Sequence, residues 1–174
     1  MKIKNEKGFT LIELMVVLVI IIVVIGLGIA AYFANLPHLR FTSATRDFVN
    51  NLRMAQQIAA KENSRVRVTF RTTTSYEVVK IVGDQDPIGF VANDVTIKTV
   101  DIGAQYKDTV QLQTPLANNN IVFGRLGAVD TSTFTFTTIA DPNCPSEFMV
   151  GIERSDGSEA RNVCINNSGR IRLP

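Results

Sequence analysis

The stretch "KGFTLIELMVVLVIIIVVIGLGIAAYFA", residues 7–34, is an apolar run interrupted near its start by one carboxylate, Glu13. Its last 21 residues, Leu14 to Ala34, carry no charge. As an α-helix they would span about 32 Å, the thickness of the hydrocarbon core of a bilayer. Residues 1–7 contain three lysines and one glutamate. By the positive-inside rule, this leader keeps the N-terminus cytoplasmic and sends the following domain across the inner membrane into the periplasm.

Three interpretations of this segment compete. A secretory signal peptide would end in a small-x-small cleavage site, and Gly28-Ile29-Ala30 fits that pattern. A plain single-pass anchor fits the length of the run. Neither explains Glu13, because a carboxylate in hydrocarbon costs several kcal/mol unless it finds a partner or reaches the interface.

The third interpretation rests on "KGFTLIELMVV", residues 7–17, which resembles the class III signal of type IV pilins and type II secretion pseudopilins. The resemblance implies that a prepilin peptidase cuts between Gly8 and Phe9 and that Phe9 is then N-methylated. Glu13 becomes the fifth mature residue, placed to pair with the amine of a neighbouring subunit during assembly. Three parts are therefore expected: a cleaved leader, residues 1–8; a transmembrane and filament-core helix, residues 9–36; and a globular head, residues 37–174.

The helical pattern continues into the head. Apolar residues recur at three- and four-residue steps, at Phe41, Ala44, Phe48, Leu52, Ala55 and Ala59. Pro37 is expected to end or kink the first helical run. Asn63 and Ser64 mark the expected end of the second.

Alternating segments follow and predict strands. "RVRVTF", residues 65–70, places Val66, Val68 and Phe70 on one side and Arg65 and Arg67 on the other. Further strands are expected in "SYEVVKIV", "VTIKTV", "VQLQ", "NIVFGRLG", "STFTFTTI", "FMVGIER", "RNVCIN" and "RIRLP". Asp156-Gly157 predicts a hairpin turn. The head is therefore α+β, a helix packed on antiparallel β-sheets.

Most of the head resembles the GspH/FimT group of minor pilins and pseudopilins. The segments that carry the resemblance are "SATRDFVNNLRMAQQIAAKENSRVRVTF", residues 43–70, and "NIVFGRLGAVDTSTFTFT", residues 120–137. It implies a type IV pilin-like fold and partners among other pilin subunits. The group has two branches: minor pilins of type IV pili, some linked to DNA uptake, and the H subunit of type II secretion pseudopili.

The two cysteines, Cys144 and Cys164, are expected to form a disulfide if the head is exported, and to be two buried thiols otherwise. The sequence gives no sign of catalysis, cofactor or metal binding. Its one histidine, His38, has no partner pattern, and neither a nucleophile motif nor a phosphate-binding glycine loop occurs. We therefore expect a structural or binding protein, not an enzyme.

The tail "NNSGRIRLP", residues 166–174, is the candidate binding element. In a strand, Arg170 and Arg172 would lie on one face, about 6–7 Å apart, close to the spacing of phosphates along one DNA strand. Ile171 and Leu173 would then face the core. The segment resembles the Gly-Arg-x-Arg element of FimT-like minor pilins, which is associated with DNA binding, and Gly169 would permit its turn.

Arg161, on the preceding strand, is expected to extend this patch. Without a neighbouring aromatic residue for base stacking, contacts to the phosphates of duplex DNA are expected. The alternative is an ordinary half-exposed terminal strand. Two functions stay open: a type IV minor pilin that binds double-stranded DNA for uptake, and a purely structural type II secretion pseudopilin.

Overall fold

The structure is a computed structural model that describes residues 8–83, 94–113, 120–130, 144 and 148–173. It divides the chain into two compact units, Met1–Leu39 and Arg40–Pro174. The helix α1, Leu11–Lys61, contributes residues to both units. α1 does not end at Pro37, one of the two outcomes expected from the sequence, but continues through it.

The C-terminal end of α1 lies where the sequence predicts it. Asn63 takes a left-handed conformation, with a φ of 48°. The backbone N–H of Ser64 donates to the carbonyl of Ala59 at 3.1 Å. Asparagine is one of the few residues other than glycine that tolerate this conformation, which closes the last helical turn.

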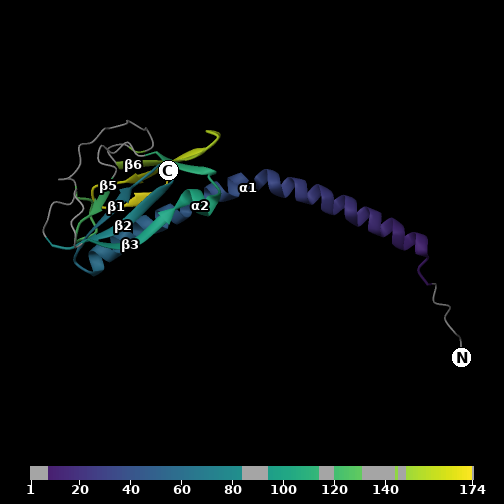
Figure 1. The fold of residues 1–174 in the computed structure, drawn as a ribbon, viewed down its shortest axis with the longest axis horizontal. Helices are drawn as coiled ribbons and strands as arrows, with labels where there is room; N and C mark the ends of the chain where they lie inside the picture. The colour runs from purple at the N-terminus through teal and green to yellow at the C-terminus, as the bar shows by residue number, and fades with distance from the viewer. Residues whose placement is uncertain (1–7, 84–93, 114–119, 131–143, 145–147, 174) are drawn as a thin grey trace, which may run out of the picture. The chain divides into compact units, whose positions relative to one another are not determined.

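The second unit contains two antiparallel four-stranded sheets (Figure 1). The first has the order β3-β2-β1-β5 and is made of β1 (Arg65–Phe70), β2 (Ser75–Ile81), β3 (Val95–Asp101) and β5 (Asn120–Phe123). The second has the order β4-β6-β7-β8 and is made of β4 (Val110–Gln113), β6 (Phe148–Arg154), β7 (Ala160–Ile165) and β8 (Ile171–Arg172). The α+β class and the long helix on antiparallel sheets are confirmed. The expected strand "STFTFTTI" lies outside the described residues.

One core joins the helix to both sheets. The six apolar residues that recur along the soluble part of α1, from Phe41 to Ala59, are each no more than 2% exposed. The Phe48 ring meets the Tyr76 ring of β2 edge-on, with centroids 5.3 Å apart. Val150 and Val163, from the second sheet, belong to the same core. All of these residues lie after Leu39, so the second unit has its own complete core.

Arg67 departs from the sequence prediction. The alternation in β1 places it on a solvent face, yet its side chain is fully buried, and Nη2 donates to Asp94 Oδ2 at 2.8 Å. β1 is an interior strand, between β2 and β5, and every residue from Val66 to Phe70 is buried. Because both faces of this strand are covered, the charge has a buried carboxylate as its partner in place of water.

Two local features complete the fold. The Asp156-Gly157 turn joins β6 to β7 in an antiparallel hairpin, as the sequence predicts, with Gly157 at a φ of 71°. A short helix, α2 (Ile102–Tyr106), was not predicted. Its start carries a signal in retrospect, because the Asp101 side chain accepts a hydrogen bond from the Ala104 N–H at 2.9 Å and so caps the helix.

Candidate functional site

The N-terminal segment begins with a capped helix. Gly8, Phe9 and Thr10 precede α1, and Thr10 Oγ1 accepts a hydrogen bond from the Glu13 N–H at 3.3 Å. Threonine at the cap with glutamate three residues later is the sequence pattern of a capping box. Glu13 is thus also a carboxylate in the first helical turn, where the helix dipole favours negative charge. Sequence reasoning missed this local role, although the Thr-x-x-Glu spacing indicates it.

The large apolar side chains of the described part of the first unit lie on its surface. Every large apolar residue of α1 from Leu11 to Phe33 is exposed, by between 45% and 77%. By length and composition, α1 is long and apolar enough to cross a membrane. Such a surface is suited to lipid or to the apolar helices of other subunits, not to water.

The C-terminal turn, residues 166–170, is built by hydrogen bonds to one residue. The Asn166 carbonyl accepts from the Gly169 N–H at 2.8 Å, and the Asn166 Oδ1 accepts from the Arg170 N–H at 2.7 Å. Gly169 has a φ of 84°, a conformation that side chains disfavour. The expectation that Gly169 permits a tight turn therefore has a geometric basis.

This turn is fastened to a second turn, Gly124–Gly127, which follows β5. The Gln56 Nε2 atom, on α1, donates to the carbonyl oxygens of Gly127 and Gly169 at 2.8 and 3.0 Å. The Val129 N–H donates to the Asn167 carbonyl at 3.1 Å. A Cβ on Gly169 would lie 2.2 Å from the Gly127 carbonyl oxygen, so glycine is required there for closeness as well as for φ.

The tail arginines differ in their surroundings. Arg170 is exposed and precedes β8, which spans only Ile171 and Arg172 and is therefore shorter than the sequence suggests. Arg172 is half-buried and lies opposite Cys164 of β7. Ile171 is buried, as expected, but Leu173 is 41% exposed. The prediction that Leu173 faces the core is wrong, because the strand ends one residue before it.

Arg161 does not extend this patch in the structure. Arg161 lies on the same face of β7 as Val163 and Ile165, which face the core, whereas Arg172 shares the opposite face of the sheet with Cys164. The Arg161 guanidinium carbon lies 5.3 Å from the centre of the Phe41 ring of α1. This is a cation–π contact at the side of the sheet that packs on the helix.

Cys144 and Cys164 form a disulfide in the structure, with their Cα atoms 5.6 Å apart. Cys164 is fully buried in β7, and the residue that pairs with it on β8 is Arg172. The bond therefore fixes the strand on which the two-residue β8 depends.

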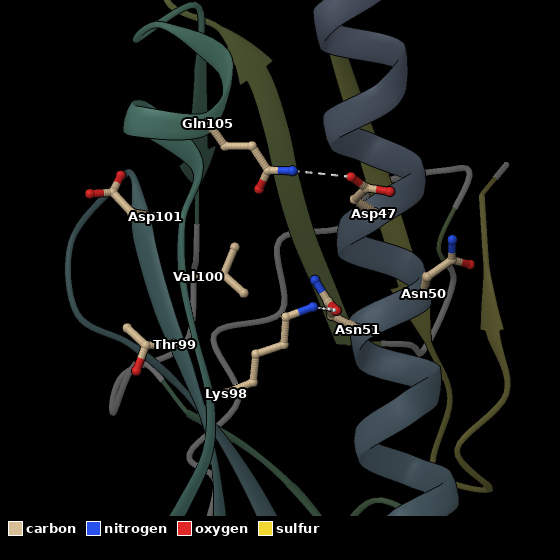
Figure 2. A pocket seen from close by; sticks show the side chains of 8 residues that line it. All are labelled: Asp47, Asn50, Asn51, Lys98, Thr99, Val100, Asp101 and Gln105. Carbon is tan, nitrogen blue, oxygen red and sulfur yellow. Dashed lines mark hydrogen bonds between the residues drawn. The ribbon is translucent and has the colours of Figure 1, made fainter.

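A polar cleft of about 390 Å³ lies between α1 and β3 (Figure 2). Lys98 donates to the Asn51 Oδ1 at 2.8 Å, and the Asn51 amide donates to the Tyr76 hydroxyl at 2.6 Å. Figure 2 shows Gln105 pointing across the cleft toward Asp47, with a distance of 3.4 Å between the Gln105 nitrogen and the Asp47 Oδ2. These side chains hydrogen-bond to one another, so the residues that line the cleft link the helix to the edge of the sheet.

Burial dominates the ionisation of both tyrosines near this cleft. It raises the pKa of Tyr76 to about 12, although the hydrogen bond from Asn51 acts in the opposite direction. It also raises the pKa of Tyr106 well above its usual value, and the hydrogen bond that Tyr106 donates to Asp47 adds to the effect. Both hydroxyls are therefore neutral donors or acceptors at physiological pH.

A solved structure among the matches, that of FimU, agrees with this architecture. The type IV minor pilin FimU of Pseudomonas aeruginosa matches with a TM-score of 0.55 and 16% identity, over 79% of this chain and 90% of the solved one. The minor pseudopilin EpsH of the Vibrio cholerae type 2 secretion system matches with a TM-score of 0.45 and 16% identity, over 76% of this chain and 94% of the solved one. At this identity, the likeness to FimU shows the fold alone. A comparison with curated proteins gives no significant match.

Sequence models of two families match the chain. The prokaryotic N-terminal methylation motif matches residues 3–29, which include Gly8, Phe9 and Glu13. The family described as type II transport protein GspH matches residues 44–169, from the soluble part of α1 to the glycine of the C-terminal turn. With more than half of its length matched, the chain belongs to the GspH family of minor pilins and pseudopilins.

Proposed function

We propose that this chain is a minor pilin-like subunit of a type IV pilus. A prepilin peptidase cuts it between Gly8 and Phe9, and Phe9 is N-methylated. Residues 9–36 first hold the chain in the inner membrane, with the head, residues 37–174, in the periplasm. After assembly, residues 9–36 form part of the filament core. The exposed apolar side chains of α1 carry this proposal. Leaving them in water would cost about 25 cal/mol per Å², so the mature helix needs lipid or neighbouring helices throughout its life.

Glu13 is the docking group of this helix. Its carboxylate pairs with the methylated amine of a neighbouring subunit, which offsets the cost of placing a charge among apolar side chains. The capping contact with Thr10 supports this role, because it holds Glu13 in the first helical turn, close to where the mature chain begins.

Intact mass of the protein extracted from membranes tests the processing step. Gly8→Ala should leave the leader attached. Lys4→Ala, another alanine substitution within the leader, should be processed normally. A mature chain that starts at any residue other than Phe9 contradicts the proposal.

We further propose that the head binds duplex DNA without sequence preference through Arg170 and Arg172, as a minor pilin of DNA uptake would. The observation that favours this function is the built turn at Gly169, fastened to α1 and to Gly127, from which the exposed Arg170 projects. An arginine on a fixed backbone has less freedom to lose when it meets a phosphate than one on a mobile segment. Two such contacts give weak binding, with a Kd in the micromolar range or above for one head.

A salt titration tests DNA binding. A fragment of residues 37–174, which includes the whole core, is titrated with unrelated duplexes at several salt concentrations. Each arginine that meets a phosphate contributes about −0.9 to the slope of log affinity against log salt. Arg170→Gln combined with Arg172→Gln should flatten the slope by nearly two units, whereas Arg46→Gln, on exposed α1 surface, should not. Equal affinities and slopes for wild type and double variant contradict the proposal.

The second candidate is a minor pseudopilin of the type II secretion system, with no role beyond contacts to partner subunits. The description of the matching family favours it. The two candidates share the N-terminal helix and differ at the tail. Loss of secretion after deletion of the gene, together with DNA binding equal in wild type and double variant, would favour the pseudopilin.

A further inference from the structure

Two turns that are distant in the sequence form one surface of the head. The first is Gly124–Gly127, after β5, and the second is residues 166–170, before β8. The Gln56 amide bonds to a carbonyl of each, and the Val129 N–H bonds to the Asn167 carbonyl. Three hydrogen bonds therefore oppose movement of one turn relative to the other.

The first turn is closed by its own backbone. The Gly124 N–H donates to the Ala128 carbonyl at 2.7 Å, and the Gly127 N–H donates to the Gly124 carbonyl at 2.8 Å. Both remaining residues of the turn, Arg125 and Leu126, are exposed. Arg125 therefore projects from a fixed backbone only two residues from Gly127, just as Arg170 projects from a fixed backbone one residue from Gly169.

The two segments that form this surface carry charges of one sign in their own sequence. Residues 124–129 and 166–173 contain three arginines and no aspartate or glutamate. Asp130 lines the same cleft as Arg125, and its Oδ2 lies 3.6 Å from the Arg65 Nε. Asn167 and Ser168, both exposed, add neutral polar groups, which suit phosphate oxygens without carrying sequence preference.

We infer that Arg125 is a third phosphate contact and that Gln56 is the positioning residue that holds Arg125 and Arg170 on one platform. The ligand is the duplex DNA of the proposed function, on which this inference rests. The surface then consists of Arg125, Arg170 and Arg172 and excludes Arg161. Three contacts predict a salt slope about one unit steeper than two contacts would give.

The experiment uses the same fragment and salt titration as the proposed function. Arg125→Gln should flatten the slope by about 0.9, whereas Arg46→Gln, on α1 about 15 Å from Gln56 along the helix, should leave it unchanged. A flattened slope for the Arg170/Arg172 double variant with an unchanged slope for Arg125→Gln overturns this inference alone. Unchanged slopes for both overturn DNA binding as well.

Gln56 has a matched control in its exposed neighbour, Gln57. At a temperature where each variant is fully folded by circular dichroism, Gln56→Ala should lower DNA affinity and flatten the slope, because the two turns lose their common anchor. Gln57→Ala should change neither. If Gln56→Ala lowers the midpoint of unfolding but keeps the salt slope at the wild-type value, Gln56 is only structural and does not position the arginines.

A protein partner is the competing occupant of this surface, since Leu126, at 92% exposed, is the most exposed large apolar residue of the described head. That occupant predicts that Leu126→Ser lowers incorporation into the filament while Arg125→Gln leaves DNA binding unchanged. This combination would overturn the DNA contact at Arg125.

Discussion

Gly169 and Gly127 approach each other so closely that a Cβ on Gly169 would lie 2.2 Å from the carbonyl oxygen of Gly127. Both residues have a positive φ, 84° and 77°. The contact links the last turn of the chain to the turn that follows β5, and it makes the position of Arg170 depend on residues more than forty positions earlier in the sequence.

The first prediction separates this closeness from backbone strain. Gly169→Ala and Gly157→Ala both place alanine at a positive φ, but nothing lies within 4 Å of an added Cβ at Gly157. Gly157→Ala should cost about 1 kcal/mol of unfolding free energy. Gly169→Ala should cost at least about 2 kcal/mol more, because the Gly127 carbonyl must move. Urea unfolding of residues 37–174 measures both, and equal costs would mean that the two turns separate easily.

The second prediction concerns the disulfide. Reduction of the Cys144–Cys164 bond should lower the unfolding free energy by about 3 kcal/mol in the chain-entropy description, given a closed loop with a sequence separation of 20. Urea unfolding with and without reductant measures the loss. The double variant Cys144→Ser with Cys164→Ser should be insensitive to reductant. Two thiols labelled in the unreduced, denatured protein would contradict the bond.

The third prediction is a pH dependence. Residues 37–174 contain two of the three tyrosines, Tyr76 and Tyr106, and both have a raised pKa. A raised pKa means that the folded state holds the phenolic proton more tightly than the unfolded state. The stabilisation is therefore complete below pH 10, the ordinary pKa, and declines as the pH rises toward 12.

Phenolate absorbance follows this titration. The folded fragment should show little phenolate at pH 10, whereas the urea-unfolded fragment should be half titrated there. Tyr76→Phe should make the alkaline loss of stability less steep. If the folded fragment at pH 10 gave half the phenolate signal that the unfolded fragment gives at the same pH, one of the two tyrosines would be in ordinary contact with water.

The fourth prediction distinguishes the two roles of Glu13. Glu13→Val should insert into the membrane at least as well as wild type, because a charge leaves the apolar run, but should fail to enter filaments. Thr10→Ala removes the hydroxyl that accepts from the Glu13 N–H and should cost about 1 kcal/mol of local helix stability while incorporation continues. Counting subunits in sheared filaments measures the incorporation of both variants. Equal defects would make Glu13 a helix-capping residue instead of a docking group.

Sequence periodicity predicted the parts of the fold that rest on one-sided burial. The helical face from Phe41 to Ala59, the alternation in β1 and β2 and the Asp156-Gly157 turn all depend on neighbours a few residues away. Arg67 was misplaced because alternation assumes one wet face, and whether β1 is an interior strand depends on its pairing with β5, more than fifty residues away. The short helix α2 is too brief for any periodicity to reveal it.

The candidate site shows the same division. The glycine and arginines of the tail are visible as a short local pattern, and the turn at Gly169 follows from it. The contacts of that turn with Gly127 and Gln56 have no local signal, since Gly127 and Gly169 lie 71 and 113 positions after Gln56 along the chain. Arg161 was grouped with the tail because its strand, β7, comes just before the tail. Strand alternation instead turns Arg161 toward Phe41.

The fastening of Gly169 also bears on how sequences of this kind can diverge. Gly169, Gly127 and Gln56 are held by the geometry of the head, so their replacement damages the fold whether or not DNA is bound. Arg125 and Arg170 are exposed, and their loss leaves the backbone intact. Selection for folding alone would therefore preserve the glycines after a lineage had abandoned the ligand. Among relatives, a glycine at this turn marks a shared architecture, and only the arginines that accompany it report on the ligand.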